Sequence, residues 1–388
     1  MNTRVNLLKD IVKDRLKKKV DFNENDISFF SIPYCINVFG EGIENYISNL
    51  VNISIEKICF LAFIKNRSSN SKIFDYNNSE IYELSTNGQN HIRDEFSSIL
   101  SACITGINQN SKIESGITGA LYDDFYSSSL SSPSIKFSTF LYSISKINNL
   151  NLNFKLFSQI LSETDKNLLS INLDTNEILP FRKSLFGIEN NETEKFNWSD
   201  FNNIRAVQIS IHKRRLRNIR EVNFIRNLKL SYDLLKVLMA SARKTALKDF
   251  SPDEIKSFVK RVSEEKQSLI QYLYNESIVV ENSALALKSK NFEKFVDSIR
   301  SSNLNLLQLE ITNEETLNLL NSLKNVKNII ASKISLTSGS ITCFINSQHE
   351  ESAIYDIKNK FKLLLPKLSG KIKIYSSEIT AFYLFRNN

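Results

Sequence analysis

Hydrophobic and polar positions in the first part of the chain alternate in a way that predicts mainly strands, followed by helices. Three runs rich in β-forming residues predict strands at the following positions: 27–39, 53–64 and 72–84. Apolar residues then recur at helical spacing over 90–107 and 137–147, separated by a polar stretch at 122–134. The first third is therefore expected to be dominated by strands.

The rest of the chain changes from helices back to strands. Strand patterns are expected at 168–179 and 204–211, and helical patterns extend from residue 219 as far as Lys327. Ser251 and Glu254 flank Pro252 and Asp253, which predicts a capping box at a helix start. Strand, helix and strand patterns close the chain at the following positions: 334–345, 351–364 and 371–385. Because strands and helices do not strictly alternate, the pattern predicts an α+β fold.

A length of 388 residues exceeds what one hydrophobic core usually supports, so two lobes are expected. The basic N-terminal stretch has no apolar core of signal-peptide length, and the longest apolar run, at 58–64, is too short to span a bilayer. These features predict a cytoplasmic protein without membrane insertion. Four cysteines lie far apart and only three histidines are present, which indicates reduced thiols and no metal site.

The net charge is +8, and basic residues are densest between 212 and 226. This basic segment has two interpretations: a solvated helix face, or a surface for an anionic partner. Recognition of nucleic acid usually adds interleaved aromatic residues, and only Phe224 is near, so a nucleic-acid partner is not expected. The candidate residues for an anionic partner are Lys213, Arg214, Arg215, Arg217 and Arg220.

Five segments, in the same order along the chain, carry a resemblance to a known family. Residues 32–41 (IPYCINVFGE) resemble the galactokinase signature Ala-Pro-Gly-Arg-Val-Asn-Leu-Ile-Gly-Glu, with proline, asparagine, glycine and glutamate in matching positions. Residues 126–134 stand where that family has its phosphate loop, Gly-x-Gly-Leu-Ser-Ser-Ser-Ala. The remaining segments are 247–259, 279–295 and 335–345, the last in place of a glycine-rich third motif. The chain therefore resembles the galactokinase family of the GHMP kinase superfamily.

The resemblance implies a two-lobed GHMP-kinase-like fold with a cleft between an N-terminal and a C-terminal α/β-sandwich lobe. A basic helical leader is expected at 1–25, followed by the N-terminal GHMP-kinase-like lobe at 26–200 and the C-terminal lobe at 201–388. Members of the family transfer the γ-phosphoryl group of Mg·ATP to a sugar hydroxyl. This reaction depends mostly on positioning and on stabilisation of charge.

Two positions to which the resemblance assigns the central chemistry carry neutral side chains. The family arginine falls at Cys35, and a thiol has neither a fixed charge nor the donors of a guanidinium group. The catalytic aspartate of the family falls, by a looser alignment, at Ser158. Glu163 and Asp165 are candidate substitutes, but they lie in a stretch that is expected to form a polar turn. Cys35 is expected to be a small buried hydrophobe rather than a reactive thiol.

The phosphate-binding motifs have also lost glycines, which elsewhere let backbone N–H groups approach a phosphate. Ser127 and Ser129 replace glycines of the second motif, and Pro133 replaces the serine that the family directs toward the metal. A shift of one residue would give that role to Ser132. The third motif keeps Gly339, and its other glycines are replaced by Ser335, Thr337 and Ser340.

Remnants of ligand binding have functional and structural interpretations. The substrate-binding candidates are Asn37, Glu41 and Glu44, and the nucleotide-binding candidates are Ser129, Ser131, Ser132 and Gly339. Glu41 could hydrogen-bond a polyol, or it could simply continue a strand into a turn. Ser131 and Ser132 are expected to cap a helix rather than to contact a nucleotide.

Three functions remain open from the sequence. The first is a pseudoenzyme that acts through an unknown protein partner or a small polyol ligand, with no cofactor expected. The second is a divergent but active sugar kinase that uses Mg·ATP. The third is a binder of an anionic partner through the basic segment. We expect the first, because the substitutions affect the arginine, the aspartate and both phosphate-binding motifs.

Overall fold

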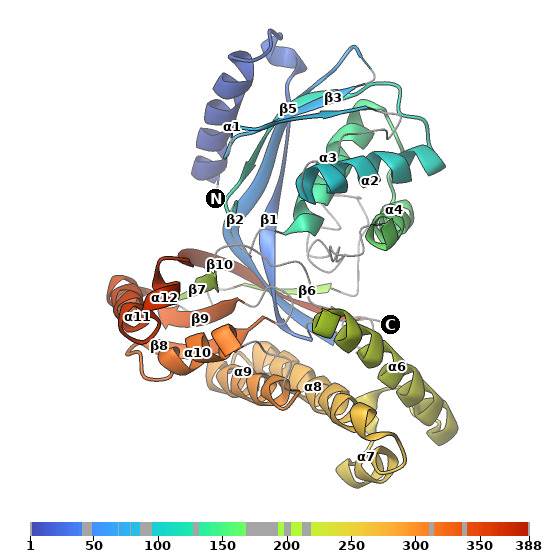
Figure 1. The fold of residues 1–388 in the computed structure, drawn as a ribbon, viewed down its shortest axis with the longest axis vertical. Helices are drawn as coiled ribbons and strands as arrows, with labels where there is room; N and C mark the ends of the chain where they lie inside the picture. Colours follow the sequence, from blue (N-terminus) through green and yellow to red (C-terminus); the bar gives the residue numbers. More distant parts are fainter. Residues whose placement is uncertain are drawn as a thin grey trace. The chain divides into compact units, whose positions relative to one another are not determined.

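The structure is a computed structural model, and it describes residues 2–40, 49–68, 70–77, 79–85, 95–126, 132–167, 193–197, 203–211, 219–309, 314–335 and 340–386. The chain forms two compact units (Figure 1). Unit 1 comprises Met1–Tyr34, Glu56–Tyr126 and Ser131–Asn190, and unit 2 comprises Cys35–Ile55, Ser127–Leu130 and Asn191–Asn388. The strands β1 (Ser28–Phe39) and β2 (Asn49–Lys65) contribute residues to both units. The domain boundaries expected after residues 25 and 200 stay predictions.

The sheet of unit 1 has the strand order β4 (Ile81–Leu84), β3 (Ser71–Asp75), β5 (Ile117–Asp123) and β2, and β1 also pairs with β2. The β3–β5 pair is parallel, whereas β3–β4 and β2–β5 are antiparallel. The sheet is therefore mixed, as α+β folds allow.

Helices cover the sheet of unit 1 on both sides (Figure 1). On one side, α1 (Asn2–Lys17) buries Leu8, Val12 and Leu16 at helical spacing against strand residues that include Phe60 and Phe74. On the other side lie three helices, α2 (Glu95–Asn110), α3 (Pro133–Ile147) and α4 (Phe154–Asn167).

In unit 2 the sheet has the order β2, β10 (Ile372–Arg386), β7 (Ile204–Ile211), β9 (Ile341–Asn346) and β8 (Ile329–Ile334), and all of these pairs are antiparallel. The long strand β10 pairs with β7 through its N-terminal half. Its C-terminal half pairs with both β2 and β6 (Thr193–Asn197). This one strand therefore joins most of the unit's strands.

The helices of unit 2 pack on this sheet and on one another. Their bounds are α6 (Ile219–Ala242), α7 (Pro252–Val259), α8 (Glu264–Lys288), α9 (Phe292–Leu307), α10 (Glu314–Leu323), α11 (Glu350–Leu364) and α12 (Pro366–Ser369). Phe295 of α9 makes edge contacts with Phe39, Phe344 and Phe382, which come from three different strands. The aromatic cluster around Phe295 is therefore a centre of the unit's core.

Most predicted elements are confirmed, including the α+β class, the strands at 27–39, 53–64 and 204–211, and the capping box at Ser251. Two predicted single strands are wrong, because 72–84 contains β3 and β4, and 334–345 contains the end of β8 and most of β9. The strand β5 lies in a region where no strand was predicted. The strand expected at 168–179 lies outside the described residues.

The stretch 162–167 is not the polar turn that the sequence suggested, because it forms the last turns of α4. Phe157, Ile160 and Leu161 are buried at helical spacing, and the helix that they anchor continues through the polar residues. Among the described residues, none of the helices combines the length and the apolar character that crossing a bilayer requires.

Candidate functional site

The structure describes only some of the residues that the sequence singled out. Asn37, Cys35, Ser132 and Ser158 are described. Outside the described residues lie Glu41, Glu44, Ser129, Ser131, Lys213, Arg214, Arg215, Arg217 and Gly339. The backbone of Arg220 belongs to the start of α6. The roles expected for the residues outside the described part therefore stay predictions.

Cys35 lies on β1, and only 8% of its surface is exposed. The pKa of Tyr383 on β10 is raised to about 12, first by burial and then by the electrostatic influence of Cys35. The expected burial of Cys35 is thus confirmed, and the Tyr383 phenol that it influences stays neutral at ordinary pH.

Ser158 lies on α4, directly after Phe157, whose ring packs against that of Phe137 on α3. The hydroxyl oxygen of Ser158 is buried and has no hydrogen-bond partner among the described residues. Next to it, Gln159 Nε2 donates a 3.3 Å hydrogen bond to Asn110 Oδ1 and ties α4 to α2. The position assigned to the family aspartate thus holds a neutral group on a packed helix.

Ser132 begins helix α3. Its hydroxyl oxygen accepts a 3.1 Å hydrogen bond from the backbone N–H of Ile135, which is the geometry of a helix N-cap. Its own N–H donates a 3.4 Å hydrogen bond to the hydroxyl oxygen of Tyr34. Ser132 is buried, and Pro133 follows it at the first helical position. The capping role expected for Ser132 is confirmed, and Pro133 offers no hydroxyl to a metal ion.

The third motif begins directly after β8 and includes most of β9. Ser335 N–H donates a 2.9 Å hydrogen bond to the carbonyl oxygen of Ser340, where β8 and β9 approach their shared connection. The described ends of this motif therefore have a structural role in a hairpin.

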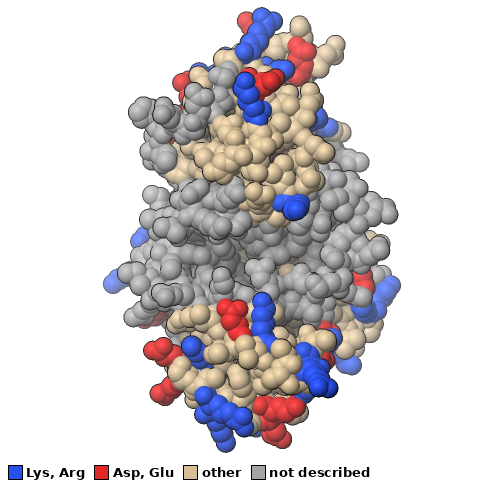
Figure 2. Space-filling view, turned by 90° about the vertical axis from the view of Figure 1, so that its right-hand side faces the viewer, with Lys and Arg blue, Asp and Glu red and all other residues tan. Residues whose placement is uncertain are grey.

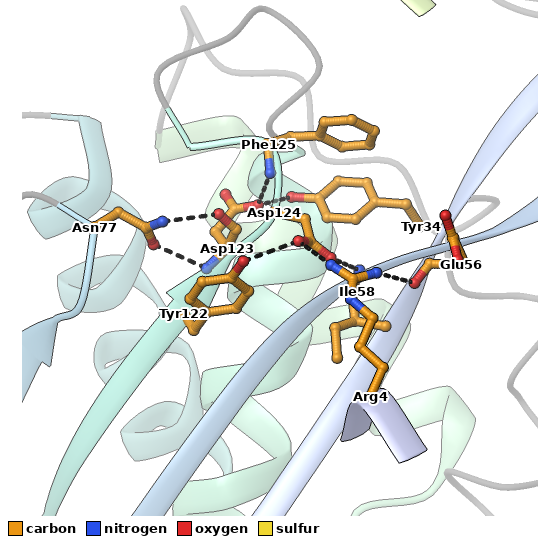
Figure 3. A network of polar contacts seen from close by, with 9 residues as sticks. All are labelled: Arg4, Tyr34, Glu56, Ile58, Asn77, Tyr122, Asp123, Asp124 and Phe125. Atoms are coloured by element: carbon orange, nitrogen blue, oxygen red, sulfur yellow. Dashed lines mark hydrogen bonds and ion pairs between the residues drawn. The ribbon is translucent and has the colours of Figure 1, made fainter. Parts of the chain in front are cut away.

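Asp123, at the end of β5, is the centre of a buried polar network in unit 1 (Figure 3). Its Oδ1 accepts a 2.7 Å hydrogen bond from the hydroxyl of Tyr34 and a 2.8 Å bond from the N–H of Phe125. The side chain of Asn77 pairs with the backbone of Asp123 through two further bonds, of 2.9 and 3.1 Å. This network fixes the point where the chain leaves β5 toward residues 126–134.

Lys136, in the first turn of α3, completes the charge balance of this network. Its Nζ lies 3.2 Å from Asp123 Oδ2, and the Lys136 side chain is only 14% exposed. Burial opposes the charged form of Lys136, but the Asp123 carboxylate outweighs it, so the pKa of Lys136 is raised. Burial, reinforced by Asp123, also raises the pKa of Tyr34 and of the Cys59 thiol. Lys136 therefore stays charged and Tyr34 and Cys59 stay neutral at ordinary pH.

Asp124 anchors a second set of contacts beside the first (Figure 3). Its carboxylate accepts hydrogen bonds from Ile58 N–H at 2.8 Å and from the Tyr122 hydroxyl at 3.0 Å, and it pairs with Arg4 of α1. Arg4 also donates a 2.9 Å bond to the carbonyl oxygen of Glu56. Burial and the Asp124 charge raise the pKa of Tyr122 to about 12. Asp124 thus joins α1, β2 and β5.

In unit 2, a buried carboxylate holds the end of β1. Glu276 on α8 accepts a 2.7 Å hydrogen bond from the Ser302 hydroxyl, and 3.4 Å bonds from Asn305 Nδ2 and from the N–H of Gly40. Gly40 has a φ of 84°, a conformation that suits glycine. The start of the turn that precedes Glu41 is therefore fixed from within the unit's own core.

Neither Asp123 nor Glu276 stood out in the sequence. Their partners come from distant segments, 89 residues away for Tyr34 and 236 residues away for Gly40. Within the described part of the chain, no three His, Cys, Asp or Glu side chains gather as metal ligands would. The described groups can fix backbone and balance buried charge, but they present no free cation or carboxylate at the positions that the resemblance assigns to catalysis.

This arrangement of strands and helices is similar to the fold of galactokinase, mevalonate kinase and heptose-phosphate kinase structures, which confirms the fold expected from the sequence. No family model matches the sequence, and no curated relative matches it either. The evidence for the fold is therefore structural.

Three solved structures illustrate the similarity. Galactokinase from Lactococcus lactis, complexed with galactose, has a TM-score of 0.75 at 14% identity, over 97% of this chain and 98% of that chain. Mevalonate kinase from Methanococcus jannaschii has a TM-score of 0.60 at 12% identity, over 94% and 100% of the two chains. D-glycero-D-manno-heptose 1-phosphate kinase from Bacteriodes thetaiotaomicron has a TM-score of 0.54 at 12% identity, over 92% and 98%. At such identities the similarity is one of fold alone.

Proposed function

We propose that this protein is a pseudoenzyme: on a galactokinase-type fold, it has lost ATP-dependent sugar phosphorylation and acts as a cytoplasmic binding, sensor or interaction protein. The observation that carries this proposal is the buried thiol of Cys35 on β1. The resemblance assigns to this position an arginine that stabilises the reacting hydroxyl and phosphate. A buried thiol beside the Tyr383 phenol supplies no positive charge for that purpose.

Three further observations support the proposal. The Ser158 hydroxyl stands where the family has a carboxylate, and a hydroxyl without a neighbouring base is a poor acceptor for a substrate proton. The Ser132 hydroxyl caps α3. The cation that follows it in the first turn, Lys136, is paired with Asp123 rather than available to a phosphate. Ser132 and Lys136 are thus engaged within the fold, and the Ser158 hydroxyl is buried.

The alternative is a divergent sugar kinase that uses Mg·ATP. It requires a phosphate site without the family's glycines and a new catalytic base, for which Glu163 and Asp165 on the last turns of α4 are the candidates. An anionic partner for the basic segment 212–226 is a further alternative, and its side chains lie outside the described residues.

Thermal unfolding with Mg·ATP and with galactose, separately and together, tests the proposal. A ligand that binds only the folded state raises the unfolding midpoint once its concentration exceeds its dissociation constant. We expect no midpoint shift with Mg·ATP and no ADP formed in the same samples. A shift with galactose alone supports a polyol sensor, and no shift directs the search to a protein partner. A nucleotide shift together with sugar-dependent ADP formation contradicts the proposal and favours the divergent kinase.

A further inference from the structure

Lysines without acidic neighbours in sequence are concentrated at the C-terminal end of α11 and in the turn that follows. Six lysines occur from Lys358 to Lys373, and no Asp or Glu occurs between Asp356 and Glu378. Within the described part of the chain, none of these six lysines lies within ion-pair distance of a carboxylate. Some lysines elsewhere in the chain, among them Lys17, Lys72 and Lys244, each form an ion pair. The lysines at this end of α11 therefore leave a local excess of positive charge.

The same segment exposes leucine side chains. Leu363 is 79% exposed and Leu364 is 54% exposed, and Leu363 is the most exposed of the large hydrophobic residues that the structure describes as exposed. Burial of such side chains away from water is favourable, so adjacent exposed leucines indicate a surface that contacts an apolar partner.

The geometry of α11 directs Lys362 and Leu363 away from the core. Ala353, Ile357 and Phe361 are buried at intervals of four residues and define the inward face of the helix. Lys362 and Leu363 follow Phe361 by one and two residues, so they lie roughly 100° and 200° around the helix, on its outward side.

The chain then turns back on itself. Leu365 N–H bonds to the carbonyl oxygen of Phe361, and Lys371 N–H bonds to that of Leu368, so α12 folds closely after α11 (Figure 1). Lys367 of α12 and Lys371 are both exposed. We define the α11–α12 basic surface as Lys358, Lys362, Leu363, Leu364, Lys367 and Lys371.

We propose that the α11–α12 basic surface docks onto an anionic lipid bilayer, with the lysines at the headgroups and Leu363 and Leu364 in the interface. Clusters of four to eight lysines on an amphipathic helix match the charge of anionic leaflets, and exposed leucines add apolar contact. Protein interfaces, in contrast, are depleted of lysine and enriched in arginine and aromatic residues, and this surface has no arginine. Such docking is peripheral and needs no helix that spans the membrane.

The distribution of charge elsewhere indicates that the excess of positive charge is local to the α11–α12 basic surface. On the face drawn in Figure 2, the described lysines and arginines are interspersed with carboxylates. The basic segment 212–226 is a second source of positive charge, so the experiment must distinguish the two by substitution.

Co-sedimentation of the full chain with vesicles tests the proposal. We expect binding to phosphatidylcholine vesicles that contain phosphatidylserine, and little binding to phosphatidylcholine alone. Each lysine near an anionic surface contributes roughly a fivefold factor, so Lys362→Gln/Lys367→Gln/Lys371→Gln should lower the partition coefficient about a hundredfold. Leu363→Ser/Leu364→Ser should lower it about tenfold without changing the net charge.

The matched control removes the same number of charges at three other exposed lysines of unit 2. Its substitutions are Lys256→Gln/Lys260→Gln/Lys324→Gln. This variant should bind as the unchanged protein does, and far-UV circular dichroism should show that all variants are folded. Absence of binding to phosphatidylserine vesicles overturns the proposal, as does an equal loss in the control. Retention on polyglutamate without vesicle binding also overturns it, and assigns the surface to an acidic protein.

Discussion

The ammonium group of Lys136 lies 3.2 Å from Oδ2 of Asp123, at the base of the connection from β5 to α3. This connection is where the galactokinase resemblance puts a phosphate loop. The positive charge of Lys136, in the first turn of α3, is thus balanced by a carboxylate of the same unit, which in turn holds Tyr34 and the N–H of Phe125.

Removal of one partner should reveal how strongly this pair is coupled. Lys136→Met leaves the Asp123 carboxylate buried without its cation, and we expect a loss of about 3–5 kcal/mol in the free energy of unfolding. Asp123→Asn/Lys136→Met keeps an Oδ1 acceptor for Tyr34 and removes both charges, so it should be more stable than the sum of the single losses predicts. Urea denaturation of the four proteins measures this coupling.

Lys248→Met is the control for this cycle. Lys248 pairs with Glu281 at 3.1 Å, but its side chain is 44% exposed. Removing such a surface pair should cost about 0–1 kcal/mol. Equal losses for Lys136→Met and Lys248→Met would show that the Asp123 pair is not the structural anchor described here.

Ser132 and Ser251 allow a direct comparison between two helix caps. Ser251 caps α7 in an exposed capping box, and Ser132 caps α3 within unit 1. If Ser132 only caps its helix, Ser132→Ala and Ser251→Ala should each lower the free energy of unfolding by about 1 kcal/mol. Neither change should alter the response of the unfolding midpoint to Mg·ATP. A response to nucleotide that Ser132→Ala alone abolishes would instead assign Ser132 to a ligand site.

The pKa of Tyr383, raised to about 12 in the folded protein, predicts a loss of stability at high pH. An unfolded tyrosine has a pKa of about 10, so above that pH the unfolded state releases a proton that the folded state retains. The stabilisation is therefore complete below pH of about 10 and is lost as pH rises toward about 12. Tyr383→Phe and Tyr122→Phe should each make the free energy of unfolding fall less steeply over this range. Unchanged slopes in urea titrations would contradict these pKa shifts.

Local signals in the sequence predicted the local features well. The Ser251 capping box is formed by neighbouring residues, and β1 follows from a continuous run of β-forming residues. The error at 72–84 arose because the alternation continues across a turn, where Asp75 Oδ1 accepts a bond from Asn77 N–H. Alternation alone does not distinguish one strand from a hairpin.

The buried polar contacts could not be predicted, because they depend on segments far apart in the sequence. Asp123 meets Tyr34 only after β1, β2 and β5 have formed their sheet, and Glu276 meets Gly40 only when α8 packs near the end of β1. Cys35 and Ser158 could be identified from the sequence, because a family resemblance aligns individual positions along the chain. It does not predict which side chains surround those positions in the fold.

The most direct test of the pseudoenzyme proposal is the transfer of label from γ-labelled Mg·ATP to galactose and to a panel of other sugars. At high protein concentration, the unchanged chain should form no labelled sugar phosphate above the background without protein. Cys35→Ser should behave identically, since the thiol takes no part in the chemistry of a pseudoenzyme. Saturable transfer to any sugar by the unchanged chain would contradict the pseudoenzyme proposal and establish a divergent kinase.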